Sequence, residues 1–381
     1  MPTTASAASP PRGRPRARDL GIPLAGEPGP WNAITDVAGV EVGFETLIRG
    51  EGPLVQGRGP VRTGVTTVLP LGRAGVGDSC PAGWSSLNGN GEMTGTAWLD
   101  EAGALSLPVG ITNTHAVGPV HSAIIDWSIR QRPELSGRWH LPVVAETWDG
   151  YLNDANGGHI TVDSACRALD TAASGPVAEG SVGGGTGMSC YGFKGGTGTA
   201  SRQVTIGETS YGVGALTQAN FGSRQELVIA GRSVGLSLPD DNPAEDDGRP
   251  APPGAGSCIV VVATDAPLLP AQCTALARRV PLGLARTGTT GSHFSGDLFL
   301  AFSATNVGAL DSSGDTSSQP GLRVIEFLPW GSMDPLYRAV VESVEEAVLN
   351  ALVAGETMVG RDDHRSPGFP VERLGELLDR G

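Results

Sequence analysis

The chain has 381 residues, of which 39% are hydrophobic, and this is enough apolar material for a large folded core. Its 57 glycines and 29 prolines stay just below the share that is typical of disordered or low-complexity chains. A net charge of −14 argues against partners such as nucleic acid or an anionic membrane, and no apolar run is long enough for a membrane span.

The N-terminal segment and the metal-binding residue types carry few signals. Residues 1–18 are rich in Pro, Ala and Arg and contain no apolar stretch of a signal peptide, so we expect a disordered arm and a cytoplasmic protein. The five cysteines lie far apart without CxxC spacing, and the six histidines show no HxxxH or HxH spacing. We therefore predict no disulfide framework, no metal and no other cofactor.

Short β-branched runs between glycines predict strands, first at 64–71 and last at 323–328. Apolar residues at helical spacing predict helices over 116–130, 162–173 and 270–280.

The clearest predicted helix covers 335–352. Asp334 is expected to cap it, Pro335 to occupy its first position and Gly355 to end it. Its broad apolar stripe must be buried, most simply against a sheet. Since strands and helices do not alternate strictly, we predict a layered α+β fold rather than a doubly wound one.

One segment departs from this pattern. Residues 239–256 contain five carboxylates and five prolines, which predicts a solvated loop, and the apolar run 258–264 that follows predicts a buried strand. The Gly256–Ser257 bond lies at this junction. A serine freed here would carry a hydroxyl beside an α-amine that titrates near neutral pH and can act as its base. The alternative is that Gly-Ser simply ends a flexible loop.

Other segments could carry chemistry or could be ordinary turns. In 286–297, small hydroxyl residues could orient a nucleophile with Asp297 polarising Ser295, although an Asx turn explains them equally well. The run GGGTG at 183–187 lacks the lysine of a phosphate loop, which favours a tight turn or close backbone approach.

Two further segments hold candidate binding groups. In 146–154, carboxylates could hold a cationic amine and Tyr151 could donate to an oxyanion, unless the segment is a solvated loop. Asn220, at the end of an apparent strand, is an oxyanion donor or a turn residue. The run NGNGEMTG at 88–95 reads as a turn whose Asn and Glu could also line a pocket.

Several of these runs occur in the order of one known family. SLNGNGEMTG, ITNTHAVG, ETWDGYLND, GPVAEGSVGGGTGM, QANFGSR and GSCIVVVATDAPLLP resemble the L-aminopeptidase/D-esterase family, which includes the β-peptidyl aminopeptidases. The resemblance spans roughly residues 16–352. It implies a four-layer α/β/β/α sandwich, similar in shape to N-terminal-nucleophile hydrolases but different in strand connectivity. It also implies a precursor cleaved between Gly256 and Ser257 into an α chain, 1–256, and a β chain, 257–381, that together form one domain.

The resemblance also assigns roles to residues. Ser257 matches the nucleophile, Ser295 and Asp297 match the pair that assists it, and Tyr151 and Asn220 match the oxyanion donors. Glu146 is expected to bind the substrate ammonium. This chain has Asp297 where the β-peptidyl branch has Glu, which shortens the acid by one methylene.

These matches predict an aminopeptidase that releases small N-terminal residues from peptides, amides or esters through an acyl-enzyme on Ser257. Similar enzymes suggest a homotetramer of αβ units. One alternative is an acyltransferase with the architecture of the ornithine acetyltransferases, although these use a threonine at the junction. The other is a non-catalytic protein that binds a small ligand.

Overall fold

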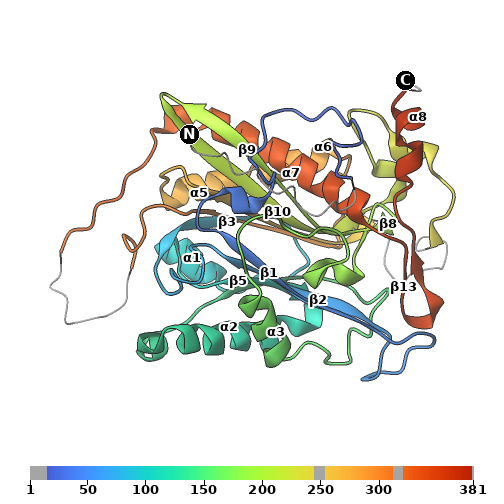
Figure 1. The fold of residues 1–381 in the computed structure, drawn as a ribbon, viewed down its shortest axis with the longest axis horizontal. Coiled ribbons are helices and arrows are strands. Elements are labelled where there is room, and N and C mark those ends of the chain that lie inside the picture. The colour runs from blue at the N-terminus through green and yellow to red at the C-terminus, as the bar shows by residue number, and fades with distance from the viewer. Residues whose placement is uncertain (1–14, 244–253, 312–320, 380–381) are drawn as a thin grey trace, which may run out of the picture.

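The computed structural model describes residues 15–243, 254–311 and 321–379. In this part of the chain two β-sheets lie face to face, and helices cover the outer face of each sheet (Figure 1). Helices α2 and α3 form one outer layer, and α5, α6 and α7 form the other. The predicted four-layer α/β/β/α sandwich is confirmed.

The larger sheet has the strand order β4-β3-β12-β11-β10-β9. Its strands are β3 (Cys80–Gly89), β4 (Ala104–Leu105), β9 (Gly196–Ile206), β10 (Thr209–Gly222), β11 (Gly254–Thr264) and β12 (Ser295–Ser303). The central strands β11 and β12 run parallel, and the neighbouring pairs are antiparallel. Helices α5 (Pro270–Ala277) and α6 (Val280–Arg286) supply the crossover that a parallel pair requires.

The smaller sheet has the order β1-β2-β5-β6. Its strands are β1 (Glu41–Arg49), β2 (Val61–Leu69), β5 (Val109–Asn113) and β6 (Val143–Thr147). Helix α2 (Val117–Gln131) packs on β5 and β6, and α3 (Val162–Asp170) packs on β1 and β2. The remaining elements are α1 (Thr96–Ala102), β7 (Ser189–Cys190), β8 (Phe193–Lys194), β13 (Met358–Val359), β14 (Arg365–Ser366) and α8 (Leu374–Asp379).

Strand β11 shows why the run 258–263 is apolar throughout. Its residues alternate between two cores, one beneath α5, α6 and α7 and one between the sheets. The first core takes Cys258, Val260 and Val262, and the second takes Ile259, Val261 and Ala263. Because both faces are buried, these six positions are all apolar, and the predicted strand is confirmed.

Helix α7 (Asp334–Ala354) packs on β9 and β10 and ends before Gly355, as predicted. The expected Asp334 cap is wrong, because Asp334 is already the first residue of the helix. A 3-10 turn over Trp330–Ser332 runs directly into α7, and the Met333 carbonyl accepts the Tyr337 N–H at 3.0 Å. Met333 therefore takes the N-cap position, and its side chain makes no capping hydrogen bond.

The predicted strand at 323–328 is wrong. This segment has no strand partner, and Leu322 and Val324 are 102% and 82% exposed. Its links to the fold include Leu328 N–H to the Pro267 carbonyl at 3.0 Å and Glu326 N–H to the Asn306 side chain at 2.8 Å. A β-branched sequence thus runs beyond the sheet, where no neighbouring strand can pair with it.

Two predicted loops need correction where the structure describes them. Residues 1–14 and 244–253 lie outside the described residues. Ala17 is fully buried, so the end of the expected arm at 1–18 packs on the fold. Residues 239–241 are exposed, as expected of a solvated loop, but Asn242 is buried and β11 already begins at Gly254, so the loop is shorter than predicted.

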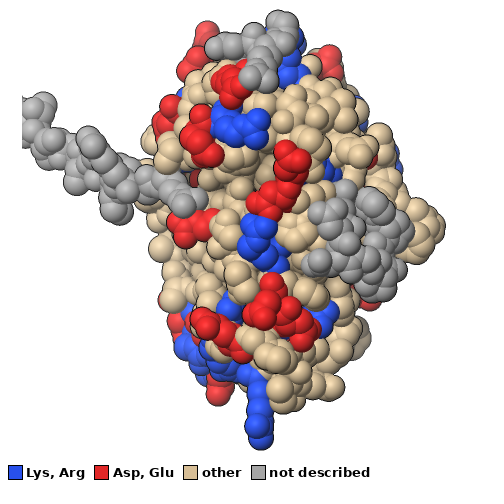
Figure 2. All heavy atoms as spheres, turned by 90° about the vertical axis from the view of Figure 1, so that its right-hand side faces the viewer, with Lys and Arg blue, Asp and Glu red and all other residues tan. Residues whose placement is uncertain are grey.

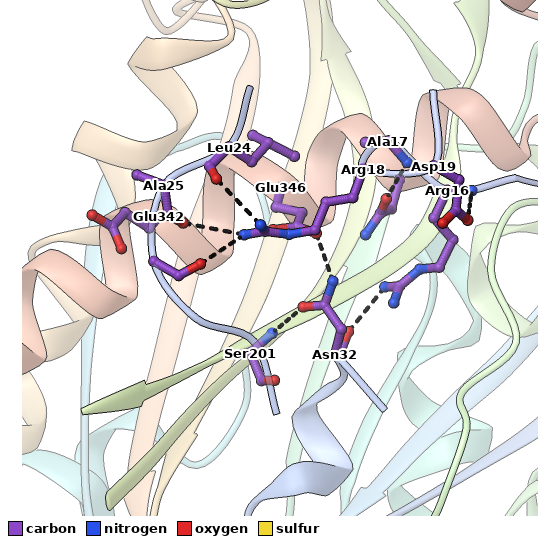
Figure 3. A network of polar contacts seen from close by, with 12 residues as sticks. Arg16, Ala17, Arg18, Asp19, Leu24, Ala25, Asn32, Ser201, Glu342 and Glu346 are labelled. Atoms are coloured by element: carbon purple, nitrogen blue, oxygen red, sulfur yellow. Dashed lines mark hydrogen bonds and ion pairs between the residues drawn. The ribbon is translucent and has the colours of Figure 1, made fainter. Parts of the chain in front are cut away.

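A buried ionic network ties the N-terminal segment to α7 (Figure 3). The Glu346 carboxylate, fully buried on α7, accepts from Arg18 Nε at 2.9 Å and from Asn32 Nδ2 at 2.6 Å. Arg202 of β9, 1% exposed, lies 2.8 Å away on the same carboxylate. Two cations and an amide thus compensate a charge that would be costly to bury alone.

On the face drawn in Figure 2, acidic and basic side chains lie interspersed among uncharged residues. No helix in the described parts of the chain is long and apolar enough to cross a membrane. Residues 15–243, 254–311 and 321–379 also contain no group of three or more His, Cys, Asp or Glu positioned to hold a metal. All five cysteines are buried and unpaired.

Candidate active site

Ser257 sits at the beginning of the buried part of β11, between two strands. On the parallel strand β12 it lies opposite Gly296, so that Ser295 and Asp297 flank it. On the antiparallel strand β10 it lies opposite Asn220. Asn220, Ser295 and Asp297, predicted from two distant segments of the sequence, are therefore neighbours of Ser257 in the sheet.

The Ser257 hydroxyl is buried, with the side chain 3% exposed, and it accepts the backbone N–H of Gly296 at 3.2 Å. Strand alternation directs Ser257 and Gly296 toward the space between the sheets, because Ile259 and Leu298 point there. Ser295 and Asp297 stand on the other side of β12.

Ser295 and Asp297 form a directly bonded pair. The Ser295 hydroxyl donates to Asp297 Oδ1 at 2.6 Å, and Asn88 of β3 donates to Oδ2 at 2.9 Å. Burial raises the pKa of Asp297, while the Ser295 hydroxyl, the Asn88 amide and the Cys258 backbone N–H counteract the rise. The shorter aspartate thus reaches its serine partner, and its carboxylate lies beside the backbone of the serine-containing strand.

Asn220 is held at both ends of its amide. Its Oδ1 accepts the Ser189 N–H at 2.9 Å, and its Nδ2 donates to the Trp148 carbonyl at 2.9 Å. The same nitrogen lies 3.3 Å from the position that a Cβ on Gly256 would occupy. The amide therefore faces the backbone directly before Ser257.

Gly256 has no room for a side chain. A Cβ built there would lie 1.8 Å from the Asn220 carbonyl oxygen. Close approach of β10 and β11 therefore requires glycine immediately before Ser257.

Glu146 reaches the site from the opposite sheet. It is 2% exposed, and its carboxylate accepts the Glu92 N–H at 2.9 Å and the Thr114 hydroxyl. A Cβ on Gly91 would lie 3.2 Å from Glu146 Oε1 and 2.9 Å from Gly296 Cα. Gly91 therefore packs between the Glu146 carboxylate and the Gly296 backbone. Burial raises the pKa of Glu146, and its hydrogen bonds work against that rise.

Tyr151 lies three residues beyond Trp148, and its described contacts point to the C-terminal segment. Its hydroxyl donates to the Arg365 carbonyl at 3.4 Å, and its ring stacks on His364 with centroids 4.7 Å apart. Tyr151 is thus linked to Asn220 through the short segment that starts at Trp148, whose carbonyl accepts from the Asn220 amide.

The segment 146–154 is not a solvated loop, since Glu146, Asp149, Asn153 and Asp154 are at most 2% exposed. Asn153 donates to Asp149 Oδ1 at 3.0 Å, and burial raises the pKa of Asp149 to about 7. A run of acids and amides looks solvent-exposed in sequence, yet here it packs against the sheet.

Sequence reasoning missed two positions. Asn88, which holds Asp297, lies in the NGNGEMTG run, whose pattern predicts a turn or part of a pocket lining. Thr114, which holds Glu146, lies in ITNTHAVG, and no local signal distinguished it. The GGGTG run does provide close backbone approach, because a Cβ on Gly185 would lie 2.3 Å from the Thr197 nitrogen.

A four-layer sandwich with a serine at the start of a central strand defines a variant of the N-terminal-nucleophile hydrolase fold, here that of a serine aminopeptidase. The chain belongs to peptidase family S58, whose family model matches residues 32–366.

The relatives extend over nearly the whole chain. The β-peptidyl aminopeptidase BapA of Sphingosinicella microcystinivorans is 50% identical over 374 residues, which cover 96% of this chain and 92% of that protein. The L-aminopeptidase D-Ala-esterase/amidase of Ochrobactrum anthropi has a solved structure that is 46% identical, with a TM-score of 0.88 and coverage of 96% and 98%. A β-aminopeptidase of Burkholderia sp. is 45% identical, with a TM-score of 0.85 and coverage of 95% and 98%.

Proposed function

We propose that this serine aminopeptidase cleaves itself between Gly256 and Ser257 and then releases small N-terminal residues from peptides, amides or esters. The observation that carries the proposal is the position of Ser257. Its hydroxyl is buried, and in the sheet it lies between the strand that carries Ser295 and Asp297 and the strand that carries Asn220. The active form would consist of an α chain, 1–256, and a β chain, 257–381.

Self-cleavage would begin with attack of the Ser257 hydroxyl on the Gly256 carbonyl carbon. The C–N bond then breaks, the nitrogen takes a proton, and Gly256 is left as an ester on the serine oxygen. Water hydrolyses the ester and frees the Gly256 carboxylate and the Ser257 α-amine. The position of Asn220 Nδ2, beside Gly256, supports its role as a donor to the oxyanion in this step.

In turnover, the new α-amine would act as the base that accepts the hydroxyl proton. Ser295 and Asp297, next to the backbone of β11, would hold this amine and tune its charge. The hydroxyl attacks the substrate carbonyl, the leaving amine or alcohol departs with the proton, and water releases the acyl group. Asn220 and Tyr151 would stabilise the tetrahedral oxyanion, each donor being worth about 3 kcal/mol.

Substrate choice would follow from Glu146. A buried carboxylate on the side of the sheet toward which Ser257 points is suited to pair with a free ammonium, which confines the reaction to the N-terminal residue. The names of the relatives suggest L-α, D-α and β-amino N-termini as the residues to compare. In line with similar enzymes, we propose a homotetramer of αβ units, which light scattering on the purified protein would test.

The test compares intact masses and activity of the wild type, Ser257→Ala and the control Ser292→Ala, a half-buried serine in the loop before β12. We expect two fragments divided after Gly256 and turnover of alanine amide in the wild type and the control. Ser257→Ala should remain one inactive chain. N-acetylalanine amide should not be hydrolysed, and a fully active wild type that stays uncut would disprove the mechanism.

A further inference from the structure

Lys194 on β8 is the one lysine of the sequence, and it is fully buried. Its ammonium donates to three backbone carbonyls, those of Met188 and Gly195 at 2.8 Å and of Gly185 at 3.3 Å. An ammonium has three N–H groups, so these acceptors satisfy it completely.

The charge of Lys194 is expensive to bury. Burial lowers its pKa to about 7, and the titratable group that acts on it is the Cys190 thiol on β7. Its described acceptors are neutral carbonyls, not a carboxylate. An apolar side chain would avoid the cost of desolvating a cation, but it would deprive these three carbonyls of their N–H donors.

The carbonyls lead directly to the site. The Met188 carbonyl and the Ser189 N–H belong to the same peptide group, and that N–H donates to Asn220 Oδ1 at 2.9 Å. A cation on the carbonyl end of a peptide strengthens donation by its N–H end. Lys194, one peptide group and Asn220 thus form a continuous chain of hydrogen bonds that ends beside Gly256.

We propose that Lys194 is a positioning residue whose ammonium, through the Met188–Ser189 peptide, aligns and polarises the Asn220 amide toward the oxyanion. The inference rests on the proposed role of Asn220 as an oxyanion donor. In this arrangement Lys194 acts on the oxyanion only through the Met188–Ser189 peptide and Asn220, without touching the substrate.

The test is a double-mutant cycle on matured enzyme, with Lys194→Met, Asn220→Ala and both changes together. Lys194→Met should lower kcat about tenfold with KM changed less than about twofold. In the Asn220→Ala background the same change should alter kcat less than about twofold, because the donor it acts on is gone. An equal loss in both backgrounds would overturn the proposal. If Asn220→Ala alone leaves kcat unchanged, the proposed oxyanion role itself fails.

A matched control and a second measurement separate positioning from folding. Arg224→Met removes another buried cation that donates to backbone carbonyls, those of Tyr191, Gly192 and Leu238. It should lower the melting temperature and leave kcat within about twofold. Equal losses of kcat in the control and in Lys194→Met would contradict the proposal.

The second measurement needs no variant. Wild-type protein labelled with ¹³C-lysine gives a signal from one side chain. An alanine boronic acid, which forms a tetrahedral anionic adduct on the serine, should raise the pKa of that lysine. An unchanged pKa in the adduct would overturn the proposal even if Lys194→Met did not fold.

Discussion

Replacing Gly256 by alanine should block maturation at the bond itself. The added Cβ would lie 1.8 Å from the Asn220 carbonyl oxygen, whereas real Cβ contacts do not fall below 3.0 Å. The two strands must therefore separate by about 1.2 Å at the site of attack. A misplacement of about 1 Å costs on the order of 100-fold in rate, so self-cleavage of Gly256→Ala should slow by at least this factor.

The assay follows the ratio of uncut chain to fragments by intact-mass spectrometry at fixed times after synthesis. Activity per cleaved molecule should stay near the wild-type value, because residue 256 becomes a chain end once the bond is broken. The matched control is Gly89→Ala at the end of β3, where a Cβ meets nothing within 4 Å. Cleavage of Gly256→Ala at the wild-type rate would refute the steric reasoning.

Three further outcomes are expected. Asp297→Asn keeps the shape of the side chain but removes its charge, and kcat should fall by about 100-fold or more. A change within twofold in steady-state kinetics would contradict the proposal that Asp297 holds the Ser257 α-amine. In uncleaved Ser257→Ala protein, Asp149 keeps a proton when folded up to its raised pKa of about 7 and loses it near 3.8 when unfolded. Stability should therefore fall as pH rises from 4 to 7, and adding Asp149→Asn should lessen that fall by roughly 4 kcal/mol in urea titrations, while the buried Glu146 and Asp297 keep their own smaller part of it. Glu346→Gln removes the negative charge that Arg202 faces, and it should lower the free energy of unfolding by about 3–5 kcal/mol, seen as a lower melting temperature. A loss below about 1 kcal/mol would show that the ionic network is dispensable.

Much of the architecture could be predicted from local patterns. The sequence of residues 258–263 indicates a strand buried on both faces, and each of these side chains meets a core. The apolar face of α7 and the end of this helix before Gly355 can likewise be predicted from neighbouring residues in the sequence. The exception at 323–328 shows the limit, since β propensity cannot supply the neighbouring strand that pairing needs.

Residue types and the family resemblance predict the candidate site, but they do not predict the hydrogen bonds that hold its carboxylates. Asn88 and Thr114 act by holding carboxylates that lie 209 and 32 residues away.

The amino-acid sequence by itself determined the Gly-Ser junction, the strand that follows it and the principal helices, because propensity and burial pattern act over a few adjacent residues. Tertiary structure decided which groups meet at that junction. The register of β10 and β12 against β11 puts Asn220, Ser295 and Asp297 around Ser257, and burial turns the acids of 146–154 from solvent toward the sheet. Both effects depend on contacts between distant segments, whose energies no local stretch of sequence contains.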